Sequence, residues 1–276
     1  ELTITRFPNN IFYVLSSTAS EIRDLDWFNF HLYKKEEVNI KNVTKDYGVL
    51  VLAGPKSRKV LSQLTSQNLN NNDFPWLKGK EILINKIPVR ALRVNYVGEL
   101  GWELHLPMSQ MESLYDSIYE VGKKENIINF GTYAVNSLRM EKAYRGWGAE
   151  LTGEISLVEA GMDRFFNLKK KNNFFGAKAL QNKIQSGVDI KIAYLEIDVD
   201  LADARGNEPV YHNNKIVGVV TSGGYGFRTK KSLAFAYVKS DLAKGGNLEI
   251  EIQGQRRKAE ILDKVVYDPD NKKLKA

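Results

Sequence analysis

Two carboxylates beside aromatic rings on a glycine-rich stretch are the residues of this chain whose types and spacing best fit ligand chemistry. The stretch covers residues 93–106 and reads Arg-Val-Asn-Tyr-Val-Gly-Glu-Leu-Gly-Trp-Glu-Leu-His-Leu. Its two glycines, Gly98 and Gly101, predict a bend or a close approach of backbone between two strands. An ordinary β-hairpin, with Glu99 in its turn and Glu103 on its solvent face, accounts for the same pattern.

The composition excludes several other kinds of site. The chain has no cysteine, which excludes disulfides, thiolate metal ligands and a cysteine nucleophile. The three histidines, His31, His105 and His212, stand far apart in the sequence. We therefore expect no histidine-based metal site and no Ser-His-Asp triad, and we predict no bound metal.

The charge balance favours a solvated surface. There are 40 basic and 33 acidic residues, a net charge of +7, dispersed among acidic and apolar segments. This pattern favours a solvated surface over nucleic-acid binding. No apolar run is long enough to cross a bilayer and no signal peptide is visible. We expect no nucleic-acid or membrane partner, and a cytoplasmic location, or the mitochondrial matrix if the source is eukaryotic.

Apolar periodicity predicts a mixture of helices and strands up to about residue 187. Helices are expected at 21–34, 56–65, 109–122, 132–144 and 176–184. Strands are expected at 1–6, 11–16, 38–43, 47–53, 80–85, 89–97, 102–107 and 162–168. The alternation of the two element types favours an α+β or mixed α/β region.

The pattern changes after residue 187 to short strands separated by turns. Strands are expected at 193–199, 209–212, 215–221, 233–238, 248–253 and 257–262. Asn213-Asn214 fits a two-residue hairpin turn. We therefore predict an α+β chain of two domains, a mixed region at 1–187 made of two interleaved subdomains and a small β-barrel at 188–276.

The order of the motifs along the chain resembles the glycine-cleavage T-protein (aminomethyltransferase) superfamily. The motifs that carry the resemblance are Gly54-Pro55 before a helix, Tyr-Val-Gly-Glu-Leu-Gly-Trp-Glu-Leu at 96–104, Gly-Thr-Tyr-Ala at 131–134, Ser-Leu-Arg-Met-Glu-Lys-Ala at 137–143, Trp147-Gly148, Val-Glu-Ala-Gly at 158–161, Thr-Ser-Gly-Gly-Tyr at 221–225 and Lys-Ser-Leu-Ala-Phe-Ala-Tyr-Val at 231–238. The resemblance covers essentially the whole chain.

Within that superfamily, residues 130–151 look most like the C-terminal folate-binding half of dimethylglycine dehydrogenase and sarcosine dehydrogenase. Those enzymes carry an FAD-dependent, amine-oxidising domain ahead of this half, and the chain has no glycine-rich dinucleotide-binding turn of that kind. The resemblance thus implies an upstream FAD domain or a separate flavoprotein subunit. It also implies that the first part of the folate-binding fold precedes Glu1.

The resemblance implies tetrahydrofolate as the ligand. Glu103 matches the glutamate that binds the ligand in T-proteins, and one carboxylate suits the adjacent N–H and amino groups of the pterin edge. Glu159 is the second choice for that role. Flat partners for the rings are expected among the aromatic side chains of the motifs, Tyr96, Trp102, Tyr133 and Tyr225.

Arg139 is the cation expected to hold the glutamyl tail of folate. The alternative for Arg139 is a helix-surface arginine paired with Glu141 or with neighbours of Glu103. The chain departs from the T-protein pattern at Val135, where T-proteins have an arginine. The catalytic residue is not identified, because the aspartate assigned to catalysis in that family would lie just upstream of Glu1.

The implied reaction is one-carbon transfer. A small methylated amine is oxidised at a flavin, and the resulting iminium or formaldehyde equivalent is captured as 5,10-methylenetetrahydrofolate, as in choline and glycine betaine catabolism. Positioning is expected to outweigh acid–base catalysis. Two alternatives stay open: a non-catalytic regulatory or scaffold protein with the same fold, and a stand-alone aminomethyl or methyl transferase.

Overall fold

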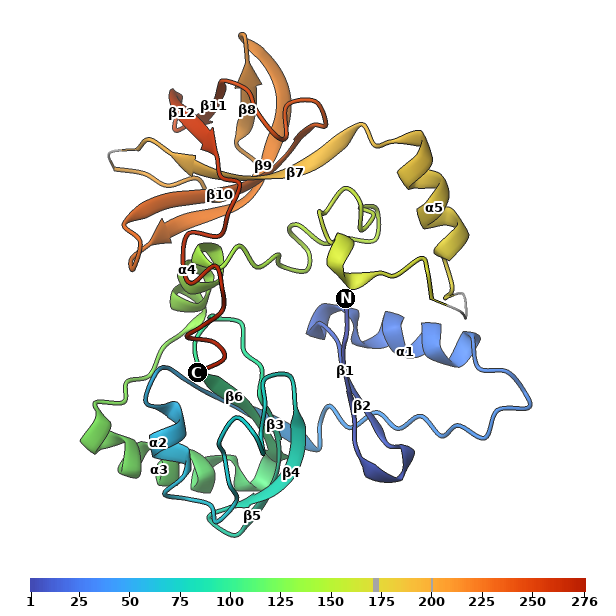
Figure 1. Ribbon diagram of the computed structural model, residues 1–276, viewed down its shortest axis with the longest axis vertical. Helices are drawn as coiled ribbons and strands as arrows, with labels where there is room; N and C mark the ends of the chain where they lie inside the picture. Colours follow the sequence, from blue (N-terminus) through green and yellow to red (C-terminus); the bar gives the residue numbers. More distant parts are fainter. Residues whose placement is uncertain (171–173, 200) are drawn as a thin grey trace. The chain divides into compact units, whose positions relative to one another are not determined.

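A computed structural model describes residues 1–170, 174–199 and 201–276 (Figure 1). Contacts between residues divide them into two compact units, Glu1–Phe130 with Asp270–Ala276, and Gly131–Pro269. Each unit has hydrophobic clusters of its own. Among the described residues, no helix is both long and apolar enough to span a bilayer.

The first unit combines a four-stranded antiparallel sheet, a separate two-stranded hairpin and several helices. The hairpin is formed by β1 (Thr3–Arg6) and β2 (Phe12–Leu15), and the sheet by β3 (Tyr47–Ala53), β4 (Gly79–Ile84), β5 (Ile87–Leu92) and β6 (Gly101–Pro107). The α-helices are α1 (Glu21–Phe30), α2 (Ser57–Leu61) and α3 (Met111–Gly122), and short 3-10 helices cover Pro8–Asn10, Thr18–Ser20, Met108–Gln110 and Lys123–Glu125.

The sheet, in the order β3-β6-β5-β4, has two different faces because successive side chains of a strand point to opposite sides. On one face Trp102 and Leu104 pack in a core with residues of α2 and α3. On the other face the buried side chain of Tyr13, from the β1–β2 hairpin, contacts His105 of β6. The strand β6 therefore separates a helix-covered core from a face with polar side chains.

The C-terminal residues 270–276 complete the first unit. Arg93, which is buried, donates hydrogen bonds through Nη1 to Asn71 Oδ1 and through Nη2 to the carbonyl oxygen of Ala276, at 2.6 and 2.7 Å. Arg58 donates to the same carbonyl at 2.8 Å. Residue 276 is thus held by Arg58 of α2 and by Arg93, which follows β5.

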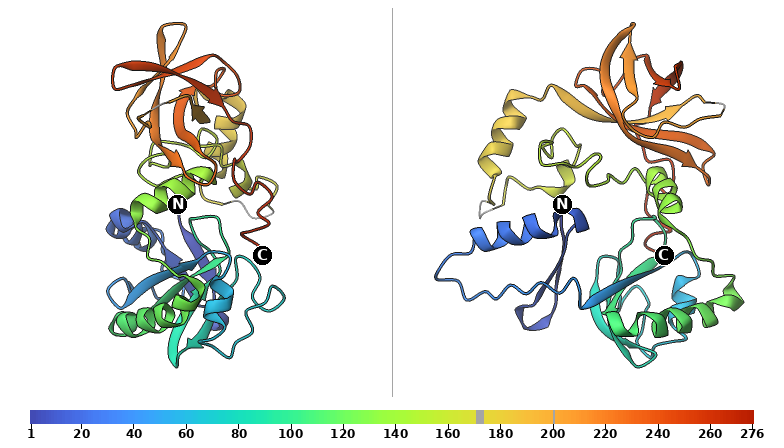
Figure 2. Two further views of the ribbon diagram at one scale, coloured as in Figure 1. Left: turned by 90° about the vertical axis from the view of Figure 1, so that its left-hand side faces the viewer. Right: turned by 180° about the vertical axis from the view of Figure 1, so that it is seen from behind.

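The second unit is built around a closed barrel (Figure 2). Its strands are β7 (Ile190–Ile197), β8 (Pro209–His212), β9 (Lys215–Gly226), β10 (Lys231–Lys239), β11 (Leu248–Ile252) and β12 (Gln255–Ile261). They follow one another around the barrel in the order β10-β7-β12-β11-β8-β9. The unit also contains the helices α4 (Thr132–Glu141) and α5 (Ala177–Ser186) and the 3-10 helix Asp163–Phe165.

The predicted α+β class with a C-terminal barrel is confirmed, and each of the six strands predicted after residue 187 overlaps a barrel strand. The predicted turn is also present, since Asn213 and Asn214 both have positive φ and join β8 to β9. The boundary at 187/188 stays a prediction. The barrel strands all follow it, whereas spatial contacts group α4 with the barrel.

Three predicted strands differ from the structure. Residues 38–43 form no strand. The next strand in the sequence, β3, pairs with β6. Residues 162–168 contain only a short 3-10 helix, Asp163–Phe165. The strand predicted at 89–97 ends at Leu92, because the chain turns away from the sheet into a loop at 93–100. Alternation of apolar residues does not by itself produce a strand when no neighbouring strand pairs with it.

Candidate functional site

Glu103 lies near the middle of β6, with Val51 of β3 and Leu92 of β5 as its neighbours across the sheet. Its side chain is 24% exposed. Val51 and Val49, two residues apart on the same face of β3, are 42% and 45% exposed. The carboxylate therefore adjoins an apolar strip that is open to solvent, an arrangement that suits a flat ligand with a polar edge.

A chain of polar contacts leads from Glu103 into the protein. His105, buried two residues further along the same face, places Nε2 3.4 Å from Glu103 Oε2. Its Nδ1 lies 3.3 Å from the hydroxyl oxygen of Tyr13. The Arg90 guanidinium stands over the rings of Tyr13 and Tyr47, 4.8 and 4.9 Å from their centroids. Burial raises the pKa of the Tyr13 phenol, although the positive charge of Arg90 opposes the shift.

The loop before β6 confirms the bend expected from its two glycines. Gly98 has a φ of +72°, and Asn95 Oδ1 accepts hydrogen bonds from the backbone N–H groups of residues 97 and 98. A Cβ atom on Gly101 would lie 2.6 Å from the carbonyl oxygen of Leu52, so β3 and β6 approach closely there. Tyr96 is half-buried in this loop rather than in a strand.

Trp102 belongs to the core. It is fully buried on the side of β6 opposite Glu103, where its ring packs edge-on against Phe74 with 6.1 Å between the centroids. This placement differs from the expected role as a ring partner, because a fully buried indole has no face open to a ligand from solvent. The immediate neighbour of Glu103 in sequence therefore stabilises the sheet.

Arg139 is also buried and pairs with a carboxylate in the second unit. Its Nη1 lies 3.1 Å from Glu150 Oε2, and its Nε donates to Asn136 Oδ1 at 3.0 Å. The alternative of a surface pair with Glu141 is wrong, since Glu141 is bound by Arg228 at 2.6 Å. Arg139 therefore differs from a solvent-facing cation that could receive a glutamyl tail.

Glu159 has protein donors at both carboxylate oxygens. Its Oε2 accepts the Ser156 N–H at 2.7 Å, and its Oε1 lies 3.0 Å from Lys183 Nζ on α5. Burial raises the pKa of Glu159, but the hydrogen bonds from Ser156 and Lys183 outweigh it and hold the pKa below the usual value. These contacts connect the loop before the barrel to α5.

The remaining aromatic candidates lie in the second unit. Tyr133, in the first turn of α4, is 89% exposed. Tyr225, on β9, is exposed and packs edge-on against Phe227. The backbone carbonyl of Tyr225 accepts a hydrogen bond from the Ser137 hydroxyl, which joins β9 to α4. As ring partners of a ligand, Tyr96, Tyr133 and Tyr225 stay predictions.

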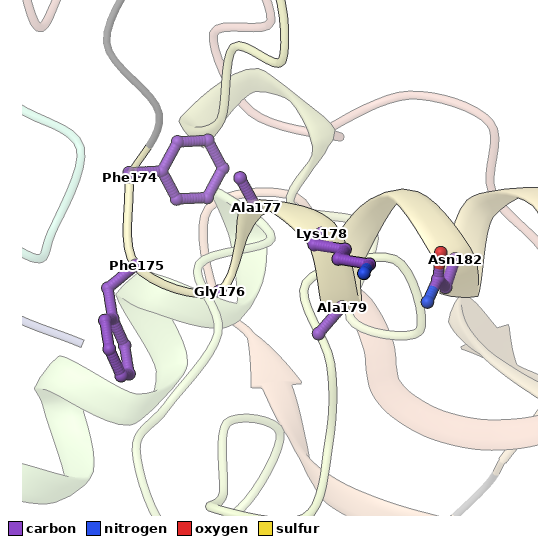
Figure 3. A pocket seen from close by; sticks show the side chains of 7 residues that line it. All are labelled: Phe174, Phe175, Gly176, Ala177, Lys178, Ala179 and Asn182. Carbon is purple, nitrogen blue, oxygen red and sulfur yellow. The ribbon is translucent and has the colours of Figure 1, made fainter.

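A hollow in the second unit holds none of the predicted residues. It lies at the start of α5 and is lined by Phe174, Phe175, Lys178 and Asn182 among others. The rings of Phe174 and Phe175 point in different directions (Figure 3). This surface is apolar, without the carboxylate found on the open face of β6.

Sequence reasoning missed three side chains around Glu103. His105 was considered only as a metal ligand or a member of a catalytic triad, and Val49 and Val51 only as strand residues. The spacing of two residues between Glu103 and His105, and between Val49 and Val51, was the available signal, because such residues share one face of a strand. The pairing of β3 with β6, which brings these two pairs together, is not visible in either segment alone.

Comparison with known proteins now identifies the family. The GCVT N-terminal domain matches residues 1–170, and the glycine cleavage T-protein C-terminal barrel domain matches residues 191–268. The chain belongs to the glycine cleavage T-protein family. The resemblance inferred from the motifs is thereby confirmed.

Curated relatives and a solved structure extend this assignment of the T-protein family. The human mitochondrial dimethylglycine dehydrogenase is 40% identical over 99% of this chain, which spans 32% of that protein. An aminomethyltransferase of Alkaliphilus metalliredigens is 29% identical over 99% of this chain and 73% of its own length. The crystal structure of aminomethyltransferase T from Bartonella henselae shares the fold, with a TM-score of 0.83 at 22% identity over 97% of this chain and 72% of that one.

Proposed function

We propose that this chain is the tetrahydrofolate-binding, one-carbon transfer portion of an enzyme related to dimethylglycine and sarcosine dehydrogenases. The observation that carries the proposal is the open carboxylate of Glu103 on a T-protein fold, beside the apolar strip of Val49 and Val51. Because the chain spans about a third of its dehydrogenase relatives, 32% in the human case, the amine substrate and the flavin partner belong to the proposal as well.

The residues present fit a pterin. The carboxylate of Glu103 can accept the two adjacent N–H donors of a pterin edge, which is a charge-assisted, bidentate geometry. The exposed methyl groups of Val51, directly opposite Glu103 in the register of the sheet, offer apolar contact to a ring laid along β3. A ligand with one polar edge and one apolar face is therefore matched by this part of the sheet.

The folate supplies, when bound, the two nitrogens that accept the one-carbon unit. The contribution of this chain is to bind and orient the pterin, so that these nitrogens are held in one place when the carbon arrives. Excluding water from an apolar strip also protects a reactive electrophile from hydrolysis. The amine proposed as the source is a small methylated amine, oxidised in an FAD domain or by a separate flavoprotein.

The proposal is tested by titrating tetrahydrofolate into the protein and into its Glu103→Gln variant in a calorimeter. We expect the variant to bind about tenfold more weakly or worse, the effect of losing a charge-assisted hydrogen bond of roughly 1.5 to 3 kcal/mol. Glu112→Gln, an exposed substitution on α3, is the matched control, since α3 packs on the other face of the sheet. Equal affinities for the wild type and Glu103→Gln would refute the role of Glu103.

The alternatives predict different outcomes. A regulatory or scaffold protein would bind no tetrahydrofolate and form no methylenetetrahydrofolate when a methylated amine and a flavoprotein are supplied. A stand-alone aminomethyl transferase would depend on a carrier-bound substrate and not on a flavin. A cytoplasmic location, or the mitochondrial matrix in a eukaryote, accompanies the proposal.

A further inference from the structure

We infer that His105 is a positioning residue that fixes the carboxylate of Glu103, and that Tyr13 in turn fixes His105. The inference rests on the proposed role of Glu103 and extends it to two side chains that do not themselves touch the ligand. All three residues lie in the first unit, on one side of its sheet.

The geometry brings together side chains of two separate sheets, the β1–β2 hairpin and the four-stranded sheet that contains β6. Glu103 and His105 share a face of β6, and Tyr13 reaches that face from β2, ninety-two residues earlier in the chain than His105. The Nε2 of His105 lies 3.4 Å from Glu103 Oε2, and its Nδ1 lies 3.3 Å from the Tyr13 hydroxyl. The two ring nitrogens of one buried histidine thus face one partner each.

The chemistry of the partners assigns the tautomer. An ionised carboxylate can only accept, so His105 presents Nε2–H to Glu103, and in the neutral imidazole Nδ1 is then an acceptor. The Tyr13 hydroxyl donates to that Nδ1, a role that requires a protonated phenol. A phenol with its ordinary pKa of about 10 is already protonated at neutral pH, and burial raises the pKa of Tyr13 further.

We call Glu103, His105 and Tyr13 the relay, and packing holds these side chains in place. His105 is buried, and its ring meets the Tyr13 ring edge-on with 5.4 Å between the centroids. Two further charged or titratable groups face these side chains. Arg90 of β5 stands 4.8 Å from the centroid of the Tyr13 ring, and the ring centroid of Tyr47 of β3 lies 6.2 Å from it. A carboxylate fixed at one oxygen loses less rotamer entropy when a ligand binds, and this preorganisation raises affinity.

The inference is tested with a double-mutant cycle in tetrahydrofolate affinity. His105→Leu should weaken binding about fivefold, and His105→Gln, whose amide N–H can occupy the place of Nε2–H, should restore binding to within about twofold. In the Glu103→Gln background, His105→Leu should have no further effect, because the residue acts through Glu103. Thermal unfolding of each variant checks that it is folded.

Additive losses in the cycle, or no rescue by His105→Gln in a folded variant, would overturn the inference while leaving Glu103 as a ligand residue. Equal tetrahydrofolate affinities of the wild type and Glu103→Gln would instead refute the role of Glu103 on which the inference rests. A measurement without ligand tests the contacts of His105 independently of folate binding. ¹⁵N NMR of the imidazole should show the Nε2–H tautomer in the wild type and a mixture of tautomers in Tyr13→Phe. A predominant Nδ1–H tautomer in the wild type would contradict the relay directly.

Discussion

Arg139 and Glu150 form a buried ion pair, with 3.1 Å between Nη1 and Oε2, at the place where α4 meets the barrel. Glu150 also accepts hydrogen bonds from the Thr221 hydroxyl at 2.6 Å and the Gly146 N–H at 2.8 Å, as well as from the Ser222 hydroxyl. A buried carboxylate needs such donors because desolvation of the charge is costly. The pair therefore joins a helix, a loop and β9 of the second unit.

Replacing Arg139 by methionine should destabilise the protein by about 3 kcal/mol, because Glu150 would keep a buried charge without its cation. The free energy of unfolding in urea measures this. Arg205→Met, at an exposed position, is the matched control and should change stability by less than about 0.5 kcal/mol. An equally small effect for Arg139→Met would show that the ion pair is not structural.

Glu159→Gln should lower stability in a pH-dependent manner. The folded-state pKa of Glu159 lies below the ordinary value of 4.5, so the carboxylate stabilises the folded state above that pH and loses this contribution as the pH falls through the folded-state pKa. At neutral pH we expect a gap of about 1 kcal/mol between the free energies of unfolding of the wild type and the variant. The gap is small because Lys183 is partly exposed. The gap should narrow in acid. Glu154→Gln, exposed, should show none, and a gap independent of pH would contradict the assignment.

Gly101→Ala should destabilise the first unit by about 1 to 3 kcal/mol, since a new Cβ would force β3 and β6 apart. The nearest atoms to that Cβ would be the Leu52 carbonyl oxygen at 2.6 Å and the Ala53 Cα at 2.8 Å. Thermal unfolding followed by circular dichroism measures the loss. Gly153→Ala is the control, because a Cβ there would meet nothing within 4 Å. Equal melting temperatures for the two variants would contradict the close approach.

Val51→Asp should reduce tetrahydrofolate affinity about tenfold or more, because it sets a like charge opposite Glu103 and removes the apolar contact. The same repulsion should lower the free energy of unfolding by no more than about 1 kcal/mol, since Val51 is 42% exposed. Val51→Asn has a similar shape without the charge and should lose less affinity. If both variants bound as the wild type does in calorimetry, the ligand would not lie on this strip.

The sequence predicted elements whose signal is local. The barrel strands were visible as short alternating runs between turn residues, and Asn213-Asn214 occupies the left-handed conformations that such a turn needs. Residues 38–43 alternate equally well, yet they form no strand. Whether an alternating segment becomes a strand depends on a partner elsewhere in the chain, which a single sequence does not reveal.

The same limit applies to the candidate site. Glu103 was identifiable from its motif, whereas its neighbour Trp102 was assigned to the ligand and is a core residue. Alternation predicts that the two side chains point to opposite faces, but it does not say which face is covered by helices. The partner of Arg139 was not predictable for a related reason, because Glu150 becomes its neighbour only through folding.

The discontinuity of the first unit has a consequence for biosynthesis. Residues 270–276 leave the ribosome after all of Gly131–Pro269, yet they carry the carbonyl of Ala276 that the buried Arg93 binds. Domains generally fold in the order in which they emerge. Here the early sheet can collapse first, but its buried guanidinium gains that acceptor only when translation has passed the barrel. The first unit is thus completed only after the second unit has been synthesised.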